Sequence, residues 1–118
     1  MTDRVFVYGL LRPGSRLHHV VEQFVRAATP ASVPGRLYDT GLGYPAALFG
    51  HGGRIEGSVL HLDRPDEALS LLDEVESEGE LYRRVVVEAT TDDGPTSAWS
   101  YEWLRGTDGL REVGPVWP

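Results

Sequence analysis

Two distant segments of this 118-residue chain contain the residue types that could do chemistry. The first runs from Val5 to Gly14, where an apolar, β-branched and aromatic strand breaks at Gly9 into a loop. Backbone N–H groups in such a loop can approach a ligand closely. The second runs from Leu72 to Glu76, where the apolar stripe of a helix ends in a group of carboxylates. The first segment could supply hydrogen-bond donors, and the second could supply an acid or a base.

Composition narrows the chemistry that is available. The chain has no cysteine, lysine or asparagine, which excludes disulfides, thiolate nucleophiles, Schiff bases and the lysine of a phosphate-binding loop. The net charge of −7, with dispersed arginines, argues against a nucleic-acid partner. The four histidines lack the paired spacing of a zinc site, so the sequence predicts no metal and no cofactor.

The length indicates one domain over residues 1–118, just large enough to bury roughly two-thirds of its unfolded surface. No apolar run approaches the roughly 20 residues of a membrane span, and no signal peptide precedes the first strand. We therefore expect a cytoplasmic protein that makes no membrane contact.

The elements that must position the two segments are predicted to be strands and two helices. Apolar spacing predicts one helix over residues 17–27 and another from Asp63, as N-cap, to about Asp73. A turn at 51–53 predicts a hairpin. Strands are expected at 5–8, 33–38, 46–49, 55–62, 84–90 and 98–103. The predicted fold is α+β, a small mixed-strand β-barrel with two flanking helices.

These residues also carry a family resemblance. The matching stretches occur in order along nearly the whole chain: Val7–Gly14, Tyr44–Ala46, Gly57–Leu60, Leu72–Glu76, Tyr82–Arg84 and the strand of Tyr101. They resemble the gamma-glutamylcyclotransferase-like superfamily, in its short bacterial form related to gamma-glutamylamine cyclotransferases. Each piece alone is weak, but the ordered set is specific.

The resemblance implies a cavity that holds a small-molecule gamma-glutamyl substrate. In the implied reaction, the substrate's α-amine attacks its own γ-carbonyl, which forms 5-oxoproline and releases an amine. By the family's pattern, Glu76 is the general acid/base. The implied substrate-binding residues are Tyr8, Gly9, Leu10, Leu11, Arg12, Tyr44, Tyr82 and Tyr101.

The sequence departs from the family's pattern at three positions. Leu10 stands where Ser or Thr is common, so one hydroxyl contact is missing. Ser77 stands where glycine commonly follows the glutamate, and Leu17 occupies the region of a frequent asparagine. These departures leave the chemistry intact and bear on which substrate is used.

Simpler interpretations exist for the same residues. Glu76 lies in an acidic stretch that could be a solvated helix end. Tyr82 and Tyr101 could fill a barrel with their hydroxyl groups at the rim. Arg84 would then pair with a neighbouring carboxylate, and Arg12 would be a solvated loop residue.

Two further functions fit the same pocket. One is a gamma-glutamyl acyltransferase or deprotecting enzyme of a biosynthetic pathway. The other is a non-catalytic binding module for an amino-acid-like ligand. A pure binding module gains little from a buried, desolvated carboxylate, so a glutamate at position 76 favours catalysis.

Overall fold

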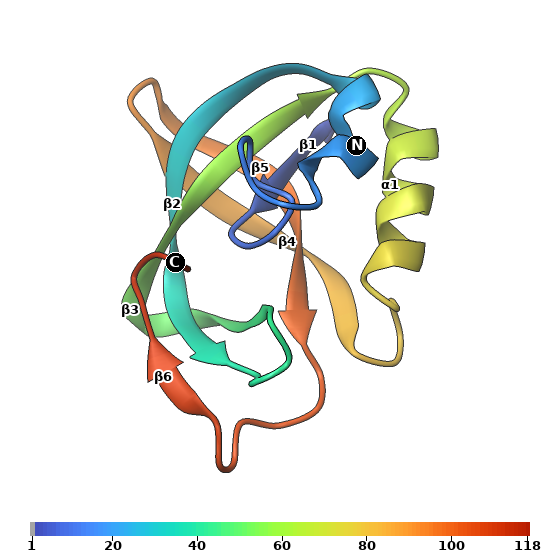
Figure 1. Ribbon diagram of the computed structural model, residues 1–118. Coiled ribbons are helices and arrows are strands. Elements are labelled where there is room, and N and C mark those ends of the chain that lie inside the picture. The colour runs from blue at the N-terminus through green and yellow to red at the C-terminus, as the bar shows by residue number, and fades with distance from the viewer. Residues whose placement is uncertain (1) are drawn as a thin grey trace.

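The structure, a computed structural model, describes residues 2–118 and all their side chains except that of His51. Along this part of the chain the elements are β1 (Arg4–Val7), η1 (His18–Val20), η2 (Glu22–Phe24), β2 (Val25–Asp39), β3 (Pro45–Leu62), α1 (Pro65–Val75), β4 (Tyr82–Thr91), β5 (Gly94–Trp103) and β6 (Arg111–Val113). Figure 1 shows α1 standing beside the strands. None of these helices has the length and apolar character needed to cross a membrane.

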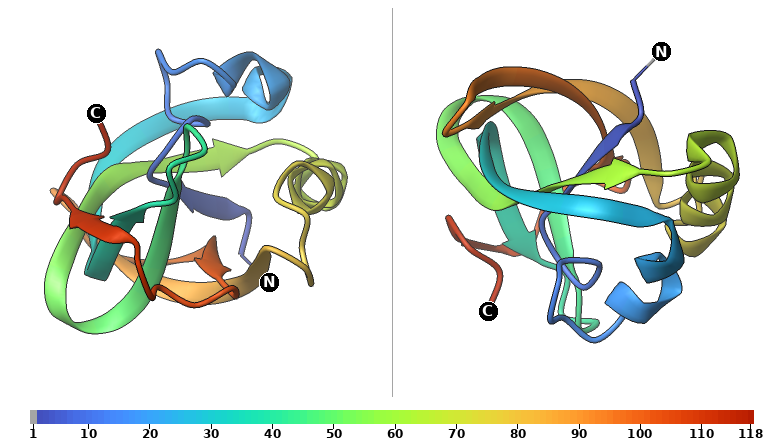
Figure 2. Two further views of the ribbon diagram at one scale, coloured as in Figure 1. Left: turned by 60° about the horizontal axis from the view of Figure 1, so that its bottom comes forward. Right: turned by 90° about the horizontal axis from the view of Figure 1, so that it is seen from above.

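The strands form one mixed sheet in the order β3-β1-β5-β4-β2-β6, with a further pairing between β2 and β3. β1 lies antiparallel to β3 and parallel to β5, where Val5 is opposite Trp99. Figure 2 shows how strongly the long strands curve. The mixed sheet with a helix at its side agrees with the predicted α+β class. Closure into a barrel stays a prediction, and the register of β2 with β4 is a single pair, Ser32 with Thr90.

β2 and β3 are much longer than the sequence predicted. They pair antiparallel over nearly their whole length. Between Pro34 and Gly35 of β2, the partner in β3 changes from Arg54 to Phe49, so residues 50–53 bulge out of the pairing. The predicted hairpin at these residues is therefore wrong, because the segments on both sides of the turn pair with the same strand.

The helix predicted over residues 17–27 is wrong. Two short 3-10 turns, η1 and η2, occupy its first part, and β2 begins at Val25. Val21 and Phe24 are buried, while Val25 pairs with Leu62 of β3. Val25 carries a β-branched side chain, which favours a strand when a long partner strand is present, so the chain enters β2 where the helical pattern would continue. The described residues thus contain one α-helix beside the sheet rather than two.

α1 agrees with the second predicted helix apart from its ends. Pro65 occupies the first turn, as predicted, but the N-cap position belongs to Arg64 rather than Asp63. The buried residues are Ala68, Leu69 and Leu72, whose spacing corresponds to one helix face. The helix continues to Val75, so Glu76 follows directly at its C-cap.

β1 is buried on both faces and joins two apolar clusters. Val5 and Val7 belong to a cluster that includes the buried face of α1, while Phe6 and Tyr8 belong to the other cluster. This alternation is typical of a central strand. A Cβ on Gly57 of β3 would collide with the carbonyl oxygen of Val7. This close approach fixes the point at which the chain leaves β1 and enters the following loop.

The C-terminal segment, from residue 106 to 118, packs against the sheet. β6 pairs with β2, where Val113 is opposite Leu37. The carbonyl of Pro115 accepts a hydrogen bond from the Glu56 N–H at 2.9 Å. Trp117 is 9% exposed and packs in the same apolar cluster as Tyr8. The end of the chain is therefore close to the residues that follow β1.

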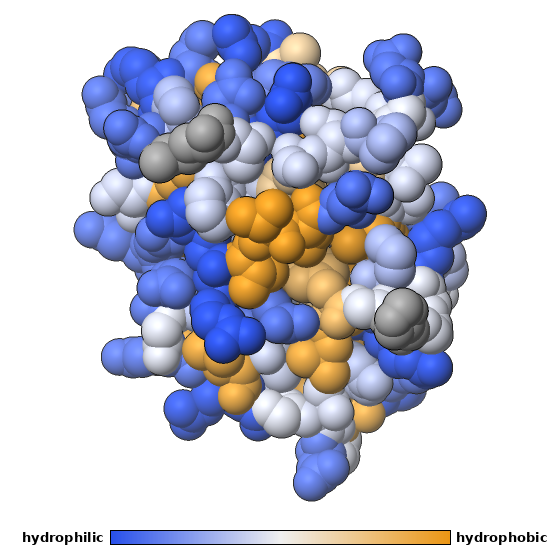
Figure 3. All heavy atoms as spheres, turned by 180° about the vertical axis from the view of Figure 1, so that it is seen from behind, coloured by the Kyte–Doolittle hydropathy of each residue, from blue (hydrophilic) through white to orange (hydrophobic). Residues whose placement is uncertain are grey.

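Some apolar surface stays exposed. Figure 3 shows apolar side chains gathered near the middle of the face that lies behind the view of Figure 1. Val86 of β4 is 58% exposed, and it pairs across the strands with Trp99. The guanidinium of Arg84 lies 4.5 Å from the centre of the Trp99 ring and covers part of this strand pair.

Candidate active site

A cavity of about 170 Å³ lies between the loop after β1, the start of β3 and the end of α1. Its lining consists of Phe6, Val7, Tyr8, Gly9, Leu10, Leu11, Leu17, Tyr44, Pro45, Val75, Glu76, Leu81, Tyr82 and Tyr101. Glu76 is the one charged side chain among them. Pockets for drug-sized ligands measure about 300–1,000 Å³, so this cavity fits a small chemical group. Across the described residues, no cluster of His, Asp and Glu could hold a metal ion.

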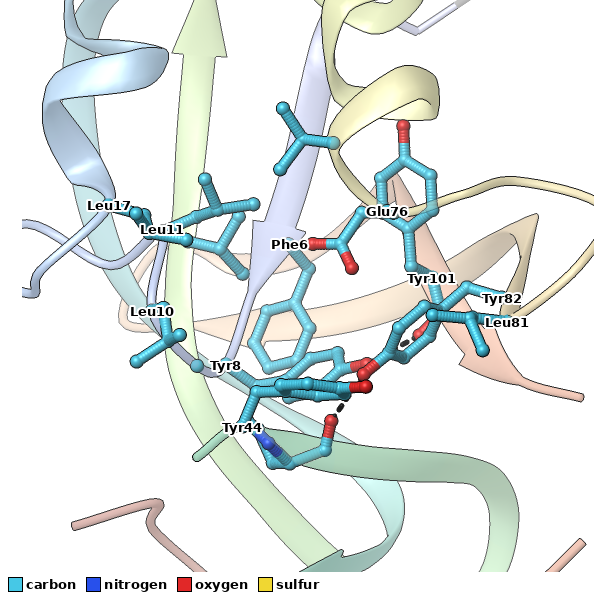
Figure 4. A pocket seen from close by; sticks show the side chains of 14 residues that line it. Phe6, Tyr8, Leu10, Leu11, Leu17, Tyr44, Glu76, Leu81, Tyr82 and Tyr101 are labelled. Carbon is cyan, nitrogen blue, oxygen red and sulfur yellow. Dashed lines mark hydrogen bonds between the residues drawn. The ribbon is translucent and has the colours of Figure 1, made fainter. Parts of the chain in front are cut away.

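Glu76 is positioned by the way in which α1 ends. Its N–H donates to the carbonyl of Leu72 at 2.9 Å, which closes the last helical turn. The next residue, Ser77, has a left-handed backbone with φ 51°, so the chain turns away there. The carboxyl points into the cavity (Figure 4), and burial raises its pKa from 4.5 to about 7. A carboxyl with this pKa can accept and return a proton near neutral pH.

The loop after β1 forms another wall of the cavity. Within residues 2–118, the N–H groups of Gly9, Leu10 and Leu11 donate no hydrogen bond. A Cβ on Gly9 would lie 2.8 Å from Cγ of Pro45, so the close approach of these two segments requires glycine. Unpaired N–H groups beside a cavity are available to an anionic group of a ligand.

Three cavity tyrosines use their hydroxyl protons in hydrogen bonds within the protein. Tyr8 donates to the carbonyl of Tyr101 at 2.6 Å, and Tyr82 donates to the carbonyl of Pro45 at 2.5 Å. Tyr101 donates to the Asp73 carboxylate at 2.7 Å. Burial raises the pKa of all three phenols well above the ordinary value of 10. They are therefore neutral, rigid walls rather than acids at working pH.

Tyr44 differs from the other three. Its hydroxyl makes no hydrogen bond within residues 2–118, and in Figure 4 it lies near the hydroxyl groups of Tyr8 and Tyr82. Its position is set by a short closed loop, in which Thr40 Oγ1 donates to the Tyr44 carbonyl at 2.7 Å. Tyr44 is thus the cavity phenol whose proton is free for a ligand.

The predicted site residues come together in this cavity, with one exception. Glu76, the residues 9–11 and the four tyrosines all line it. Arg12 does not line it, because its Nε donates to the Gly9 carbonyl at 2.9 Å and its Nη2 to the Trp117 carbonyl at 2.8 Å. Burial lowers the pKa of this guanidinium. The predicted contact between Arg12 and substrate finds no support in this geometry.

Six lining residues were not predicted as site residues: Phe6, Val7, Leu17, Pro45, Val75 and Leu81. Apolar periodicity identifies buried side chains, but it does not tell which of them border a cavity. One signal was present, since Val75 and Leu81 are the chain neighbours of Glu76 and Tyr82.

Asp73 ties the end of α1 to the sheet. Besides accepting the Tyr101 hydroxyl, it pairs with Arg84, whose Nε lies 3.0 Å from Asp73 Oδ1. Arg84 therefore pairs with a carboxylate, as the simpler interpretation predicted. The same interpretation, a solvated acidic helix end, fits the exposed Glu74 but does not fit Glu76.

This architecture has counterparts among solved structures. An AIG2-like protein of Mus musculus gives a TM-score of 0.79 at 19% identity and covers 98% of this chain and 88% of its own. YkqA of Bacillus subtilis gives a TM-score of 0.74 at 26% identity and covers 96% of this chain. This chain spans only 38% of the length of YkqA. The mixed sheet with one α-helix is a gamma-glutamyl cyclotransferase-like fold.

The sequence comparison narrows this class to one family. Residues 5–115 match the family described as gamma-glutamyl cyclotransferase, AIG2-like. The gamma-L-glutamyl-butirosin B gamma-glutamyl cyclotransferase of Niallia circulans is 32% identical over 107 residues, which cover 86% of this chain and 67% of that enzyme. The chain belongs to the gamma-glutamyl cyclotransferase, AIG2-like family of enzymes, which confirms the resemblance noted in the sequence.

Proposed function

We propose that this protein cyclises a gamma-glutamyl amine or peptide to 5-oxoproline and releases the amine, with Glu76 as the general acid/base. One observation carries the proposal. The Glu76 carboxyl, with a pKa raised to about 7, projects into a cavity that also offers unpaired N–H groups of residues 9–11. A proton carrier and donors for an anion are the two things that this reaction needs.

The proton balance of the reaction fits a single carboxyl. The substrate's α-nitrogen attacks its γ-carbon, and Glu76 takes a proton from the attacking nitrogen. The C–N bond to the leaving amine then breaks as the same carboxyl returns the proton to that amine. Residues 9–11 stabilise the developing oxyanion or hold the substrate's α-carboxylate through their N–H groups.

The intramolecular nature of the reaction explains what the cavity lacks. The nucleophile and the electrophile belong to one molecule, so no cysteine or serine nucleophile is needed. The protein must hold the substrate in a folded conformation, which can lower the barrier by about 7–11 kcal/mol. The rigid tyrosine walls around Glu76 are suited to that task.

The substrate's two ends meet different surroundings. The cavity of about 170 Å³ is small enough to select the gamma-glutamyl group, which leaves the released amine to extend out of it. Leu10 presents an apolar wall where a hydroxyl residue is common in the family, which favours a leaving amine without a polar partner at that point. The Niallia circulans relative acts, by its name, on a gamma-L-glutamyl conjugate, so removal of a gamma-glutamyl group in a biosynthetic pathway is a second candidate.

Two other functions compete for the same cavity. A gamma-glutamyl acyltransferase would pass the glutamyl group to an external amine, and a binding module would hold an amino-acid-like ligand without turnover. The raised pKa of Glu76 argues against the binding module, because a desolvated carboxyl weakens the fold without contributing to simple binding.

The test is a panel of gamma-glutamyl compounds incubated with the protein, followed by mass detection of the products. The proposal expects 5-oxoproline and the free amine in equal amounts from at least one compound. A new gamma-glutamyl conjugate in the presence of added amines would support the acyltransferase instead. Tight binding of 5-oxoproline without any turnover across the panel would support the binding module.

A further inference from the structure

Arg12 connects the loop after β1 to the C-terminal segment. Its Nε donates to the Gly9 carbonyl at 2.9 Å, and its own N–H donates to the same carbonyl at 3.2 Å. Its Nη2 donates to the Trp117 carbonyl at 2.8 Å. A planar guanidinium can bridge two acceptors in this way, whereas a lysine ammonium lacks the fixed fork. The side chain thus contacts the back of the loop and not the cavity.

The carbonyl that Arg12 holds determines the direction of a neighbouring N–H group. The Gly9–Leu10 peptide is planar, and in a trans peptide the C=O and N–H groups point in opposite directions. The Gly9 oxygen faces Arg12, so the Leu10 N–H points away from Arg12. Leu10 lines the cavity, and its N–H donates no hydrogen bond within residues 2–118.

The other end of the bridge is anchored firmly. Trp117 is 9% exposed and packs in the apolar cluster that contains Phe6 and Tyr8. Pro115, two residues earlier, accepts the hydrogen bond from the Glu56 N–H in β3. Because Trp117 is fixed by packing, its carbonyl can hold Arg12, and Arg12 can hold the loop.

We propose that Arg12 is a positioning residue, which aims the Leu10 N–H into the cavity, and that the buried Trp117 is the anchor through which it acts. The inference rests on the proposed function, because it assigns the Leu10 N–H to an anionic group of a gamma-glutamyl ligand. Arg12 itself touches no substrate. The C-terminal segment therefore contributes to ligand binding from outside the cavity.

The test measures 5-oxoproline binding by calorimetric titration in the full-length wild type and in Arg12→Gln, Arg12→Lys and Trp117→Ala. Arg16→Gln is the matched control, since Arg16 is in the same loop, is exposed and forms no ion pair within residues 2–118. Arg12→Gln should weaken binding by roughly 10- to 100-fold, the range for one hydrogen bond to a charged group. The affinity of Arg12→Lys should lie between those of the wild type and Arg12→Gln, and Arg16→Gln should bind like the wild type.

Two readouts separate positioning from general stability. In NMR spectra, the Leu10 amide resonance of the wild type should shift strongly when 5-oxoproline is added. In Arg12→Gln the same resonance should shift much less, even at a 5-oxoproline concentration that saturates the variant. If Trp117→Ala folds, it should bind 5-oxoproline more weakly than the wild type. The double variant Arg12→Gln/Trp117→Ala should bind no more weakly than Arg12→Gln alone, because both substitutions remove the same bridge. If the losses of affinity add in the double variant, Trp117 does not act through Arg12.

The possible failures are distinguishable. If the wild type neither binds nor forms 5-oxoproline, the proposed function is wrong and the inference falls with it. If the wild type binds and Arg12→Gln binds equally well with a lower melting temperature, Arg12 only supports the fold. If Trp117→Ala does not fold, the Leu10 resonance in Arg12→Gln decides the outcome.

Discussion

The two regions that face each other across the cavity contribute to it by different means. The loop after β1 offers main-chain N–H groups, and its side chains Leu10 and Leu11 are apolar. The end of α1 offers one ionisable side chain, Glu76, whose pKa is raised to about 7 by burial. The loop should therefore be sensitive to backbone geometry and tolerant of apolar substitutions, whereas position 76 should tolerate no substitution that removes the acid.

In the loop the surrounding contacts fix the main chain, and at the end of α1 they fix the position of one side chain. The main chain of the loop is fixed by the contact of Gly9 with Pro45 and by the Arg12 bridge. Glu76 is fixed by the last turn of α1 and by the Asp73 contacts with Tyr101 and Arg84. A substitution in one region that had the effect expected of the other region would contradict this difference between them.

The largest expected effect is that of Glu76→Gln on turnover. The amide has nearly the same shape but cannot carry the proton, so kcat should fall by roughly 10²- to 10⁴-fold. Steady-state kinetics with detection of 5-oxoproline measures this, and Glu74→Gln is the matched control on the exposed side of the helix end. If the variant kept a tenth of the wild-type rate, another group would be the proton carrier.

The second effect is the dependence of stability on pH. The pKa of Glu76 is about 7 in the folded protein and near 4.5 in the unfolded chain, so between these values only the folded protein keeps the proton. The contribution of Glu76 to the free energy of unfolding is fully present below pH 4.5 and is lost as the pH rises through 7. The loss amounts to up to about 3 kcal/mol.

Denaturant unfolding of the wild type and Glu76→Gln across pH 4 to 8.5 measures this loss. As the pH rises, the free energy of unfolding of the wild type should fall relative to that of Glu76→Gln by up to about 3 kcal/mol. Parallel curves would mean that Glu76 is not desolvated. The same protonation should appear in kcat/KM of the wild type, which should rise with pH around a midpoint of about 7.

Gly9→Val should have the next largest effect, and it should act on binding. Its branched side chain would collide with Pro45, since a Cβ alone would lie 2.8 Å from Cγ of that residue. The loop must move, and the affinity for 5-oxoproline should fall by roughly 10-fold or more, as for a lost hydrogen bond to a charged group. Calorimetric titration beside a thermal melt measures both effects, and unchanged affinity in a folded variant would refute the role of the loop.

The smallest effect is expected from Ser77→Gly. Ser77 has φ 51°, a left-handed conformation that is strained for any residue except glycine. The substitution should stabilise the protein by about 0.5–1 kcal/mol, because the relief of strain exceeds the added freedom of the unfolded chain. Chemical denaturation measures the gain. A large change in kcat in the same variant would show that the backbone at the end of α1 acts directly in catalysis. That result would contradict the assignment of the main-chain contribution to the loop after β1 alone.

The sequence predicted α1 and β1 well, because each is determined by its own residues. Pro65 and the spacing of Leu69 and Leu72 are local signals for a helix that ends beside Glu76. The apolar run of β1 is likewise local, and the glycine at its end marks the loop. The two segments could be singled out for that reason, whereas the roles of their individual residues were implied by the family resemblance.

The remaining features depend on contacts between distant segments. Val25 continues a helical spacing in the sequence, yet it pairs with Leu62, which is far along the chain. Proline is disfavoured inside a strand, yet both Pro30 and Pro34 lie inside the long strand β2. The bridge from Arg12 to Trp117 joins residues 105 positions apart, and no local pattern indicates it.

The most direct test of the central claim is the fate of solvent oxygen during turnover. A gamma-glutamyl substrate is incubated with the protein in water enriched in ¹⁸O, and the glutamyl product is weighed by mass spectrometry. Intramolecular attack by the α-amine predicts 5-oxoproline that contains no solvent oxygen, formed in step with the free amine. Glutamate that carries one ¹⁸O would mean that water attacks the γ-carbonyl, and the proposed cyclisation would be contradicted.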